Sequence, residues 1–333
     1  MDSEIPLVDV SQLDSTQGIE RVAAELRHAF ARTGFLVVVG HAVEPDLIAS
    51  VFELARVFHA QPMERKLALR MNEHNNGYMA MERYSVRTSR VSEDALPDMN
   101  EAFFLKRERA ADDPLVLSGR RFAGPNQWPA NWPQFKTTVL DYTGAVNELA
   151  RKLLAPLAVS LKLPADYFAN AFEESQFSFR MSHYPAAQAQ RSRYGIAPHT
   201  DVNFLTLLAQ SENPGLQIQL DSGVWTDVPY IPDSFIVNAG DTLHRWTNGR
   251  ISSTAHRALS PAHQSRYAIP FFFGPHLDTQ IEPIATCVTP DVPPEFAPIR
   301  YGDFLDWWYD ANYNADDQAD LKARETEHQL RAN

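Results

Sequence analysis

The spacing of apolar residues indicates helices in the first half of the chain, interrupted by short strands. Within residues 18–33 the apolar positions Val22, Leu26 and Phe30 recur at the spacing of an amphipathic helix. Residues 46–56 and 62–69 have the same character, and 135–161 is the longest helical pattern, which Pro156 is expected to kink or end. Residues 5–10 and 34–40 are typical of strands, whereas a turn is expected at 77–78 and a proline-broken loop at 107–134.

From about residue 176 the pattern changes to short strands separated by turns. The expected strands are 177–184, 204–210, 216–220, 235–238, 253–259 and 266–273. Short strands at this spacing predict a sandwich or a barrel, and a helical pattern returns at 302–331. The chain is therefore expected to be an α+β protein. An N-terminal region, 1–134, and a region of long helix, sheet core and C-terminal helix, 135–333, are expected to form one compact unit.

Composition narrows the classes of partner. The chain has 333 residues, 44% of them hydrophobic, and a net charge of −12. Such a negative charge argues against binding to nucleic acid or to anionic membranes, since both depend on Lys and Arg. The first residues resemble no signal peptide, and the single cysteine, Cys287, excludes an internal disulfide. We therefore expect a cytoplasmic protein that acts on a small molecule, while its oligomeric state stays open.

Three residues stand out as candidate ligands of one metal ion: His199, Asp201 and His256. Two histidines and one carboxylate form the facial triad that suits non-haem Fe(II) and leaves positions open for other ligands. In a strand, residues i and i+2 point to one face, so His199 and Asp201 are expected to enter the same cavity. His256, in another strand-like run, could complete the triad and leave room for O2 and an anionic cosubstrate.

A His-x-Asp pair alone is a weak signal, because about one such pair is expected by chance in a chain of this composition. His276 and Asp278 form a second pair, but no histidine follows them until His328. The first pair is followed by His256 and, ten residues later, by Arg266 in another strand-like run. An arginine there could bind the carboxylate of a cosubstrate through two parallel hydrogen bonds.

These strings, in this order, resemble the isopenicillin N synthase-like family of Fe(II)/2-oxoglutarate-dependent dioxygenases over most of the chain. The resemblance is carried by the segments 5–9, 33–41, 180–185, 199–201, 205–208, 238–241, 246–249, 253–257 and 266–272. It implies a double-stranded β-helix, or jelly roll, flanked by helices. The implied reaction decarboxylates 2-oxoglutarate to succinate and CO2 while a small organic molecule is oxidised, most often hydroxylated. Desaturation and ring closure also occur in such enzymes, and ascorbate could stimulate turnover.

The resemblance also assigns site residues. It implies His199, Asp201 and His256 as ligands of Fe(II), and Arg266 and Tyr184 as partners of the far carboxylate of 2-oxoglutarate. Ser182 stands where the family often has asparagine, near the metal-binding end of the cosubstrate. Ala268 stands where the family usually has serine. Loss of that neutral hydrogen bond weakens 2-oxoglutarate binding by up to about tenfold, so use of 2-oxoglutarate is expected to survive.

The substrate is less well specified by the sequence. Candidate wall residues of the substrate pocket are Arg83, Tyr84, Arg87, Phe103, Phe204 and Phe273. Arg83, Arg87 and Arg90 form a local basic cluster in an acidic chain. We expect either a solvated loop or an arginine that binds an anionic group of the substrate.

Two other functions remain open at this point. One is a non-haem iron oxidase of the same fold that does not use 2-oxoglutarate, which succinate production would distinguish. The other is a jelly-roll protein that binds a ligand without turnover, which oxygen consumption would distinguish.

Overall fold

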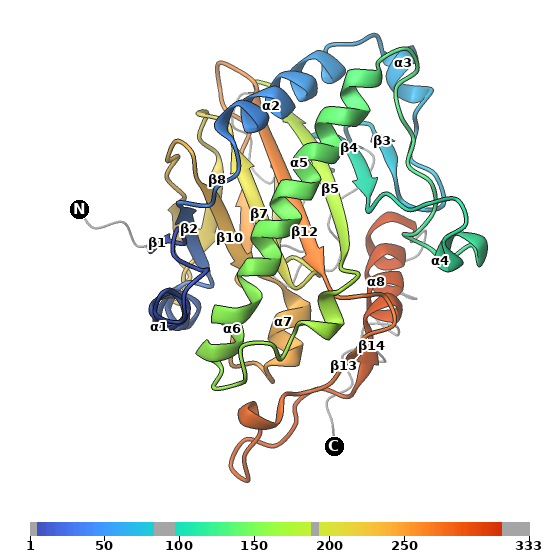
Figure 1. Ribbon diagram of the computed structural model, residues 1–333. Coiled ribbons are helices and arrows are strands. Elements are labelled where there is room, and N and C mark those ends of the chain that lie inside the picture. The colour runs from blue at the N-terminus through green and yellow to red at the C-terminus, as the bar shows by residue number, and fades with distance from the viewer. Residues whose placement is uncertain (1–4, 83–96, 188–192, 315–333) are drawn as a thin grey trace.

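The computed structural model describes residues 5–82, 97–187 and 193–314, and shows two β-sheets that face each other, with helices packed around them (Figure 1). The eight-stranded main sheet has the order β1-β2-β10-β7-β12-β5-β4-β3, and the four-stranded minor sheet has the order β6-β11-β8-β9. The expected α+β class, with a jelly-roll core flanked by helices, is confirmed.

The strands of the main sheet, in spatial order, are β1 (Leu7–Asp9), β2 (Phe35–Val39), β10 (Phe235–Ala239), β7 (Leu205–Gln210), β12 (Arg266–Gly274), β5 (Gln176–Tyr184), β4 (Glu101–Lys106) and β3 (Gly77–Met79). Those of the minor sheet are β6 (Ile196–His199), β11 (His256–Ala258), β8 (Leu216–Gln219) and β9 (Trp225–Asp227). A small hairpin joins β13 (Gln280–Ile281) to β14 (Ile299–Arg300). Strands from both 1–134 and 135–333 lie in the main sheet, so the two regions share one framework.

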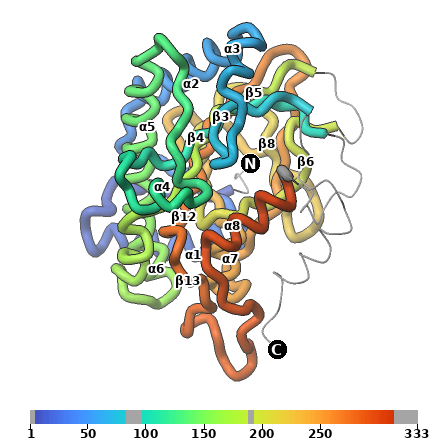
Figure 2. Tube along the Cα trace, turned by 90° about the vertical axis from the view of Figure 1, so that its right-hand side faces the viewer, coloured from blue at the N-terminus to red at the C-terminus, as the bar shows by residue number. Residues whose placement is uncertain are grey.

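The helices are α1 (Thr16–Arg32), α2 (Pro45–His59), α3 (Met63–Leu67), α4 (Pro114–Leu117), α5 (Pro133–Lys152), α6 (Leu154–Ser160), α7 (Asp241–Trp246) and α8 (Tyr301–Tyr309). In Figure 1, α5 runs along the face of the main sheet. In Figure 2, the C-terminal end of α8 approaches β6. Among the described residues, no helix has both the length and the apolar character needed to span a membrane.

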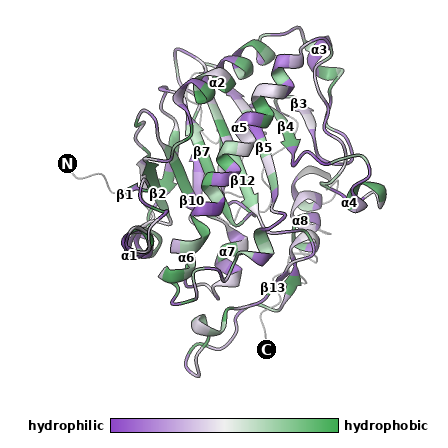
Figure 3. Ribbon diagram, viewed as in Figure 1, coloured by the Kyte–Doolittle hydropathy of each residue, from purple (hydrophilic) through white to green (hydrophobic). Residues whose placement is uncertain are grey.

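Two main apolar cores result from this arrangement, beside a small cluster of Met79, Ala102 and Phe104. The larger lies between the main sheet and the helices and includes Phe58, Phe103 and Phe135. The smaller lies between the two sheets and includes Phe35, Leu208 and Ile218. Hydrophobic residues are concentrated on β2, β7 and β10 (Figure 3), because these strands are covered on both faces.

Several predicted elements differ from the structure. The expected turn at 77–78 is strand β3, which pairs with β4, and the expected loop at 107–134 contains the short helix α4. The expected interruption of the helical pattern 135–161 by Pro156 is present, since α5 ends at Lys152 and α6, which contains Pro156, begins at Leu154. Strands β4, β9, β13 and β14 and helix α7 were not predicted, and the strand expected at His199 is β6. Helix α8 confirms the start of the expected C-terminal helix, of which residues 315–331 lie outside the described part of the chain.

Candidate active site

The three candidate ligands converge in the structure. His199 is the last residue of β6, His256 is the first of β11, and the two are partners in the pairing of these strands. Nε2 of His199 lies 3.8 Å from Oδ1 of Asp201, and Nε2 of His256 lies 3.7 Å from the same oxygen. All three side chains are largely buried. Two imidazole nitrogens and one carboxylate oxygen therefore surround a single point, as a bound cation requires.

The remaining polar atoms of these side chains are occupied by other partners. Nδ1 of His199 lies 2.8 Å from the carbonyl oxygen of Ala197, and Nδ1 of His256 lies 3.2 Å from that of Thr254. A ring nitrogen that donates to a carbonyl carries the proton, so each Nε2 keeps a lone pair directed at the common point.

The two carboxylate oxygens of Asp201 also have different partners: one is held by neighbouring side chains and the other faces the metal point. Its Oδ2 accepts hydrogen bonds from Oγ1 of Thr206 at 2.6 Å and from Nδ2 of Asn238 at 2.9 Å. Its Oδ1 faces the two histidines. Asn238, on strand β10, is therefore a positioning residue.

Strand alternation is not the reason that Asp201 faces the cavity. Strand β6 ends at His199, and Asp201 lies in the following loop. The loop is held by the start of α7, where the backbone N–H of Asp241 donates to the carbonyl of Asp201 at 2.7 Å. Gly240 permits this approach, because a Cβ there would lie 2.0 Å from the carbonyl oxygen of Asn203. A backbone hydrogen bond, rather than the expected alternation along a strand, thus directs Asp201 into the cavity of His199.

The electrostatics of the cluster suit a cation. Burial lowers the pKa of His199 to about 3, and the neighbouring His256 acts in the same direction. Burial raises the pKa of Asp201, but His256, His199 and the hydrogen bonds from Asn238 and Thr206 outweigh it, so the pKa is lowered. A neutral imidazole and an ionised carboxylate are the forms that bind a metal.

Arg266 and Ser182 reach the same cavity from the main sheet. The cavity is lined by the three candidate ligands and also by Tyr184, Arg266 and Ala268. Arg266 is 1% exposed, and its guanidinium carbon lies 4.8 Å from the centre of the Tyr184 ring. Among the described residues, Nε and Nη1 of Arg266 and Oγ of Ser182 have no hydrogen-bond partner. These buried donors fit an anionic ligand, because an unpaired buried charge is costly.

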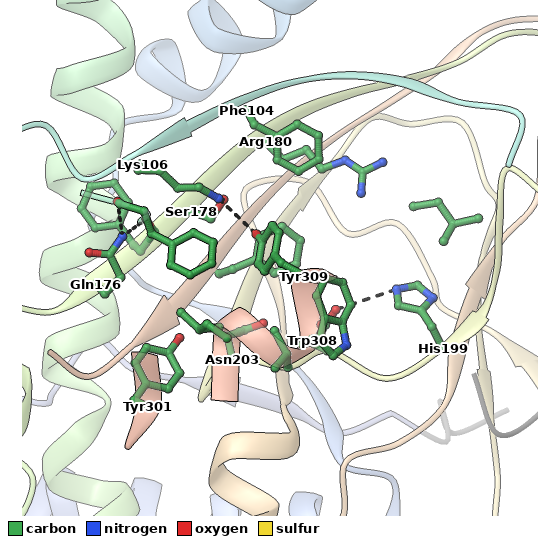
Figure 4. Close-up of a pocket in the computed structure, with 17 residues that line it drawn as sticks. Phe104, Lys106, Gln176, Ser178, Arg180, His199, Asn203, Tyr301, Trp308 and Tyr309 are labelled. Atoms are coloured by element: carbon green, nitrogen blue, oxygen red, sulfur yellow. Dashed lines mark hydrogen bonds and ion pairs between the residues drawn. The ribbon is translucent and has the colours of Figure 1, made fainter. Parts of the chain in front are cut away.

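A second cavity begins at His199 and holds about 690 Å³ of empty space, part of it open to solvent. Strands β4, β5 and β12 and helix α8 form most of its wall. Figure 4 shows its polar residues Lys106, Ser178 and Arg180, and the rings of Tyr309 and Trp308. Arg180 and His199 line both cavities, so the two spaces meet beside the candidate metal point.

Strand geometry decides which aromatic residues face this second cavity. On β4, Phe104 and Lys106 line it, whereas Phe103 points away and packs on Phe58. On β12, which Arg266 anchors, residues i+2, i+4 and i+6 share its face, so Phe272 lines the cavity and Phe273 does not.

Three expected wall residues are therefore corrected. Phe103 packs between the sheet and the helices, and Phe273 stacks on Phe172 in the same apolar core. Phe204 packs against Phe168 and Trp246. Phe104 on β4 and Phe272 on β12, the sequence neighbours of Phe103 and Phe273, line the cavity in their place. The other expected wall residues, Arg83, Tyr84 and Arg87, lie outside the described residues, as does Arg90.

The sequence analysis missed a second cluster of two histidines and one carboxylate, formed by His59, Glu101 and His183. Here Glu101 accepts hydrogen bonds from Nζ of Lys66 at 2.7 Å and from the hydroxyl of Tyr78 at 2.5 Å. Nδ1 of His183 lies 2.8 Å from its other oxygen. Both carboxylate oxygens accept hydrogen bonds and an ammonium group stands beside them, so the cluster fits a charge network better than a site for a cation.

The pair His276 and Asp278, which the sequence analysis set aside, stays apart from both clusters. Nδ1 of His276 and Oδ2 of Asp278 lie 4.0 Å apart, with half of the aspartate side chain exposed. Within the described ranges no further histidine, cysteine or carboxylate joins them as a ligand group.

Comparison with known proteins agrees with this geometry. Residues 175–275 match the 2OG-Fe(II) oxygenase superfamily, and residues 5–131 match the N-terminal region described for a non-haem dioxygenase in morphine synthesis. The 2-oxoglutarate-Fe(II) type oxidoreductase hxnY of Emericella nidulans is 32% identical, over 92% of this chain and 90% of the relative. The homoarginine-6-hydroxylase 2-ODD-C23.1 of Arabidopsis thaliana is 30% identical, over 85% and 88%.

The solved structures lead to the same family. A full-length Neurospora crassa protein, solved in complex with alpha-KG and thymine, superposes with a TM-score of 0.80 at 28% identity, over 92% of this chain and 96% of that one. These matches decide among the three functions left open by the sequence. The chain belongs to the 2OG-Fe(II) oxygenase superfamily, and it is an Fe(II)- and 2-oxoglutarate-dependent dioxygenase.

Proposed function

We propose that His199, Asp201 and His256 are the protein ligands of Fe(II). One observation carries the proposal: their Nε2, Nε2 and Oδ1 atoms face one point, while the other polar atom of each side chain is engaged elsewhere. Three protein ligands leave the remaining positions of the metal free for the cosubstrate and O2. Thr206 and Asn238 hold the carboxylate in the orientation that the metal needs.

We infer that Arg266 binds the far carboxylate of 2-oxoglutarate, that Tyr184 lies beside it, and that Ser182 contacts the end nearer the metal. Arg266 stands opposite Tyr184 and Ala268 stands opposite Ser182 in the pairing of β12 with β5, which places the two ends in one cavity. The unpaired donors of Arg266 and Ser182 support this reading. With Ala268 in place of a hydroxyl-bearing residue, the guanidinium supplies most of the binding.

The substrate is, in this proposal, a small organic molecule that is hydroxylated in the cytoplasm. When bound, iron and 2-oxoglutarate supply the oxidising power drawn from O2, with release of succinate and CO2. The chain's own contribution is the second cavity, whose aromatic wall holds the target carbon next to the metal point. The hydroxylase among the relatives supports hydroxylation, and the net charge of −12 disfavours nucleic acids and anionic membranes as partners. Ascorbate is expected to stimulate turnover.

The test of the cosubstrate site is Arg266→Leu. Loss of the buried cation is expected to weaken 2-oxoglutarate binding by about 2–5 kcal/mol, and Arg266→Lys should restore only part of it because lysine lacks the planar fork. Calorimetry with Mn(II) in place of Fe(II) measures binding, and succinate release measures turnover. His276→Ala is the control and should change neither. Unchanged affinity for 2-oxoglutarate in Arg266→Leu would contradict the assignment.

A further inference from the structure

Lys106 is a buried ammonium group at the far end of the second cavity. Its residue is 3% exposed, and its Nζ donates to Oγ of Ser178 at 2.9 Å and to the hydroxyl of Tyr309 at 3.0 Å. Asn126 fixes the backbone on both sides, since its side chain accepts from the N–H of Lys106 and donates to the carbonyl. The lysine is thus held in place with its charged end in the cavity (Figure 4).

The partners of Lys106 are all neutral. Besides the two hydroxyls, the ammonium lies 4.9 Å from the centre of the Tyr309 ring and 5.6 Å from that of Phe122. Throughout residues 5–82, 97–187 and 193–314, no carboxylate forms an ion pair with it. A lysine ammonium has three donors, and two are used here, so one donor and the whole positive charge await a partner.

Two other buried cations, Lys66 on α3 and Arg266 on β12, differ in whether the chain supplies a counter-ion. Lys66, on the opposite side of β4, has its own carboxylate, because its Nζ lies 2.7 Å from Glu101. Arg266 has none among the described residues, and its counter-ion is the carboxylate of the cosubstrate under the proposed function. Lys106 shares the condition of Arg266: a buried cation that faces a cavity and lacks an internal counter-ion. The chain leaves such a charge unpaired where a ligand completes it.

We propose that Lys106 is the binding site for an anionic group of the substrate, and that the substrate is an apolar carboxylic acid. One ammonium group neutralises one carboxylate. The hydroxyls of Ser178 and Tyr309, which accept from Nζ, orient the ammonium group. Aromatic side chains, among them Phe104, Phe272 and Trp308, form much of the remaining wall, which also holds the polar residues Gln176, Arg180 and Asn203 and the candidate metal ligands His199 and Asp201. The inference rests on the proposed function, because it assigns the substrate of that same site.

The geometry sets the length of such an acid. Lys106 is paired with Ser178 and Phe104 with Arg180 in the β4–β5 register, and Arg180 lies where the two cavities meet. Two residues along a strand advance roughly 7 Å. The carboxylate and the oxidised carbon are therefore separated by about this distance or somewhat more. Seating one end on Lys106 would direct the other toward the metal point beside His199.

The experiment compares acids with their amides, which have the same shape and no charge. The probes are phenylpropanoic acid, cyclohexylacetic acid and octanoic acid, each beside its primary amide. Their dissociation constants are measured by calorimetry on the protein loaded with Mn(II) and 2-oxoglutarate, where no turnover occurs. At least one acid is expected to bind about ten- to a hundredfold more tightly than its amide, the range for a hydrogen bond to a charged group.

Lys106→Met should reduce that preference to about one by weakening the acid alone, whereas Lys106→Arg should keep it. Lys136→Met is the matched control, because Lys136 is half-exposed and paired with Glu108 at 2.7 Å. Equal binding of every acid and its amide to the wild type would overturn the inference. So would an unchanged preference in Lys106→Met, or an equal loss for acid and amide, which is the sign of a merely structural role.

The same titrations test the role of Lys106 separately from the proposed use of 2-oxoglutarate. Failure of the wild type to bind 2-oxoglutarate would contradict the proposed function. Normal binding of 2-oxoglutarate without a preference for acids would contradict only the role of Lys106.

Discussion

Two clusters with the same residue formula lie on opposite faces of the main sheet, and His183 of the second belongs to strand β5. His199, Asp201 and His256 stand between the two sheets, whereas His59, Glu101 and His183 lie on the side of the helices. In the first, one carboxylate oxygen is held by neutral donors and the other faces only the imidazoles. In the second, both oxygens are taken, partly by an ammonium group. The partners of the carboxylate, rather than the set of residues, distinguish a metal site from a charge network.

The largest expected difference concerns iron. Asp201→Ala removes the oxygen that faces both histidines and is expected to abolish iron binding and succinate release. Glu101→Gln should leave the iron content of the folded protein unchanged. Iron per chain after anaerobic loading measures both, and the wild type should hold one ion. Two ions per wild-type chain would refute the distinction between the clusters.

Stability should respond in the opposite way. Glu101→Gln leaves Lys66 buried without its counter-ion and is expected to lower the free energy of unfolding by about 3–5 kcal/mol. Urea unfolding followed by circular dichroism measures the loss. The double variant Glu101→Gln/Lys66→Met should be more stable than the single variant, because no unpaired charge remains. A double variant at least as unstable as the single one would argue against the ion pair as the cause.

The supports of the two carboxylates offer a finer test. Asn238→Ala removes one of the hydrogen bonds to Asp201 and is expected to weaken iron binding by about 10–100-fold. Tyr78→Phe removes the matching hydrogen bond to Glu101 and should leave iron affinity as it is. Competition with a chelator compares the two. An equal effect of both variants would show that the bond to Asp201 has no special part in metal binding.

The smallest expected effect is on the pH dependence of stability. Burial raises the pKa of Glu101, but His183, His59 and Lys66 outweigh it and hold the pKa well below the ordinary 4.5. The unfolded chain therefore takes up this proton first as the pH falls, so the stabilisation is complete above about 4.5 and is lost below it. The difference in unfolding free energy between wild type and Glu101→Gln should be constant near neutral pH and shrink in acid. A difference that grows in acid would reverse the sign assigned to Glu101.

The candidate metal ligands and Arg266 could be predicted from the sequence because they occupy short strings in a fixed order. His199 and Asp201 are two residues apart, and Arg266, at the start of the next strand, follows His256 by ten residues, so the sequence pattern alone indicated the group. Their true support was not visible, since Asn238 and the start of α7 meet Asp201 only through the folded chain.

The second cluster left no local signal. Its residues come from α2, β4 and β5, and strand β4 was not recognised at all. The cavity wall could have been predicted better, because the face of Arg266 fixes the face of Phe272 six residues later. The burial of Lys106 in the cavity could not have been predicted, because a lysine at a strand end is normally solvated.

The arrangement of strand β5 determines which mutations can alter the substrate range of this enzyme. Its cavity face presents Gln176, Ser178, Arg180, Ser182 and Tyr184 in one line, with the cosubstrate residues at one end and the partner of Lys106 at the other. Substitutions near Ser178 could redirect the enzyme to new compounds while the oxidising end stays intact. A single-residue insertion in the same strand would instead turn every cavity-facing side chain on one side of the insertion toward the helix-covered core. Diversification along this strand is thus open to point mutation and closed to changes of length.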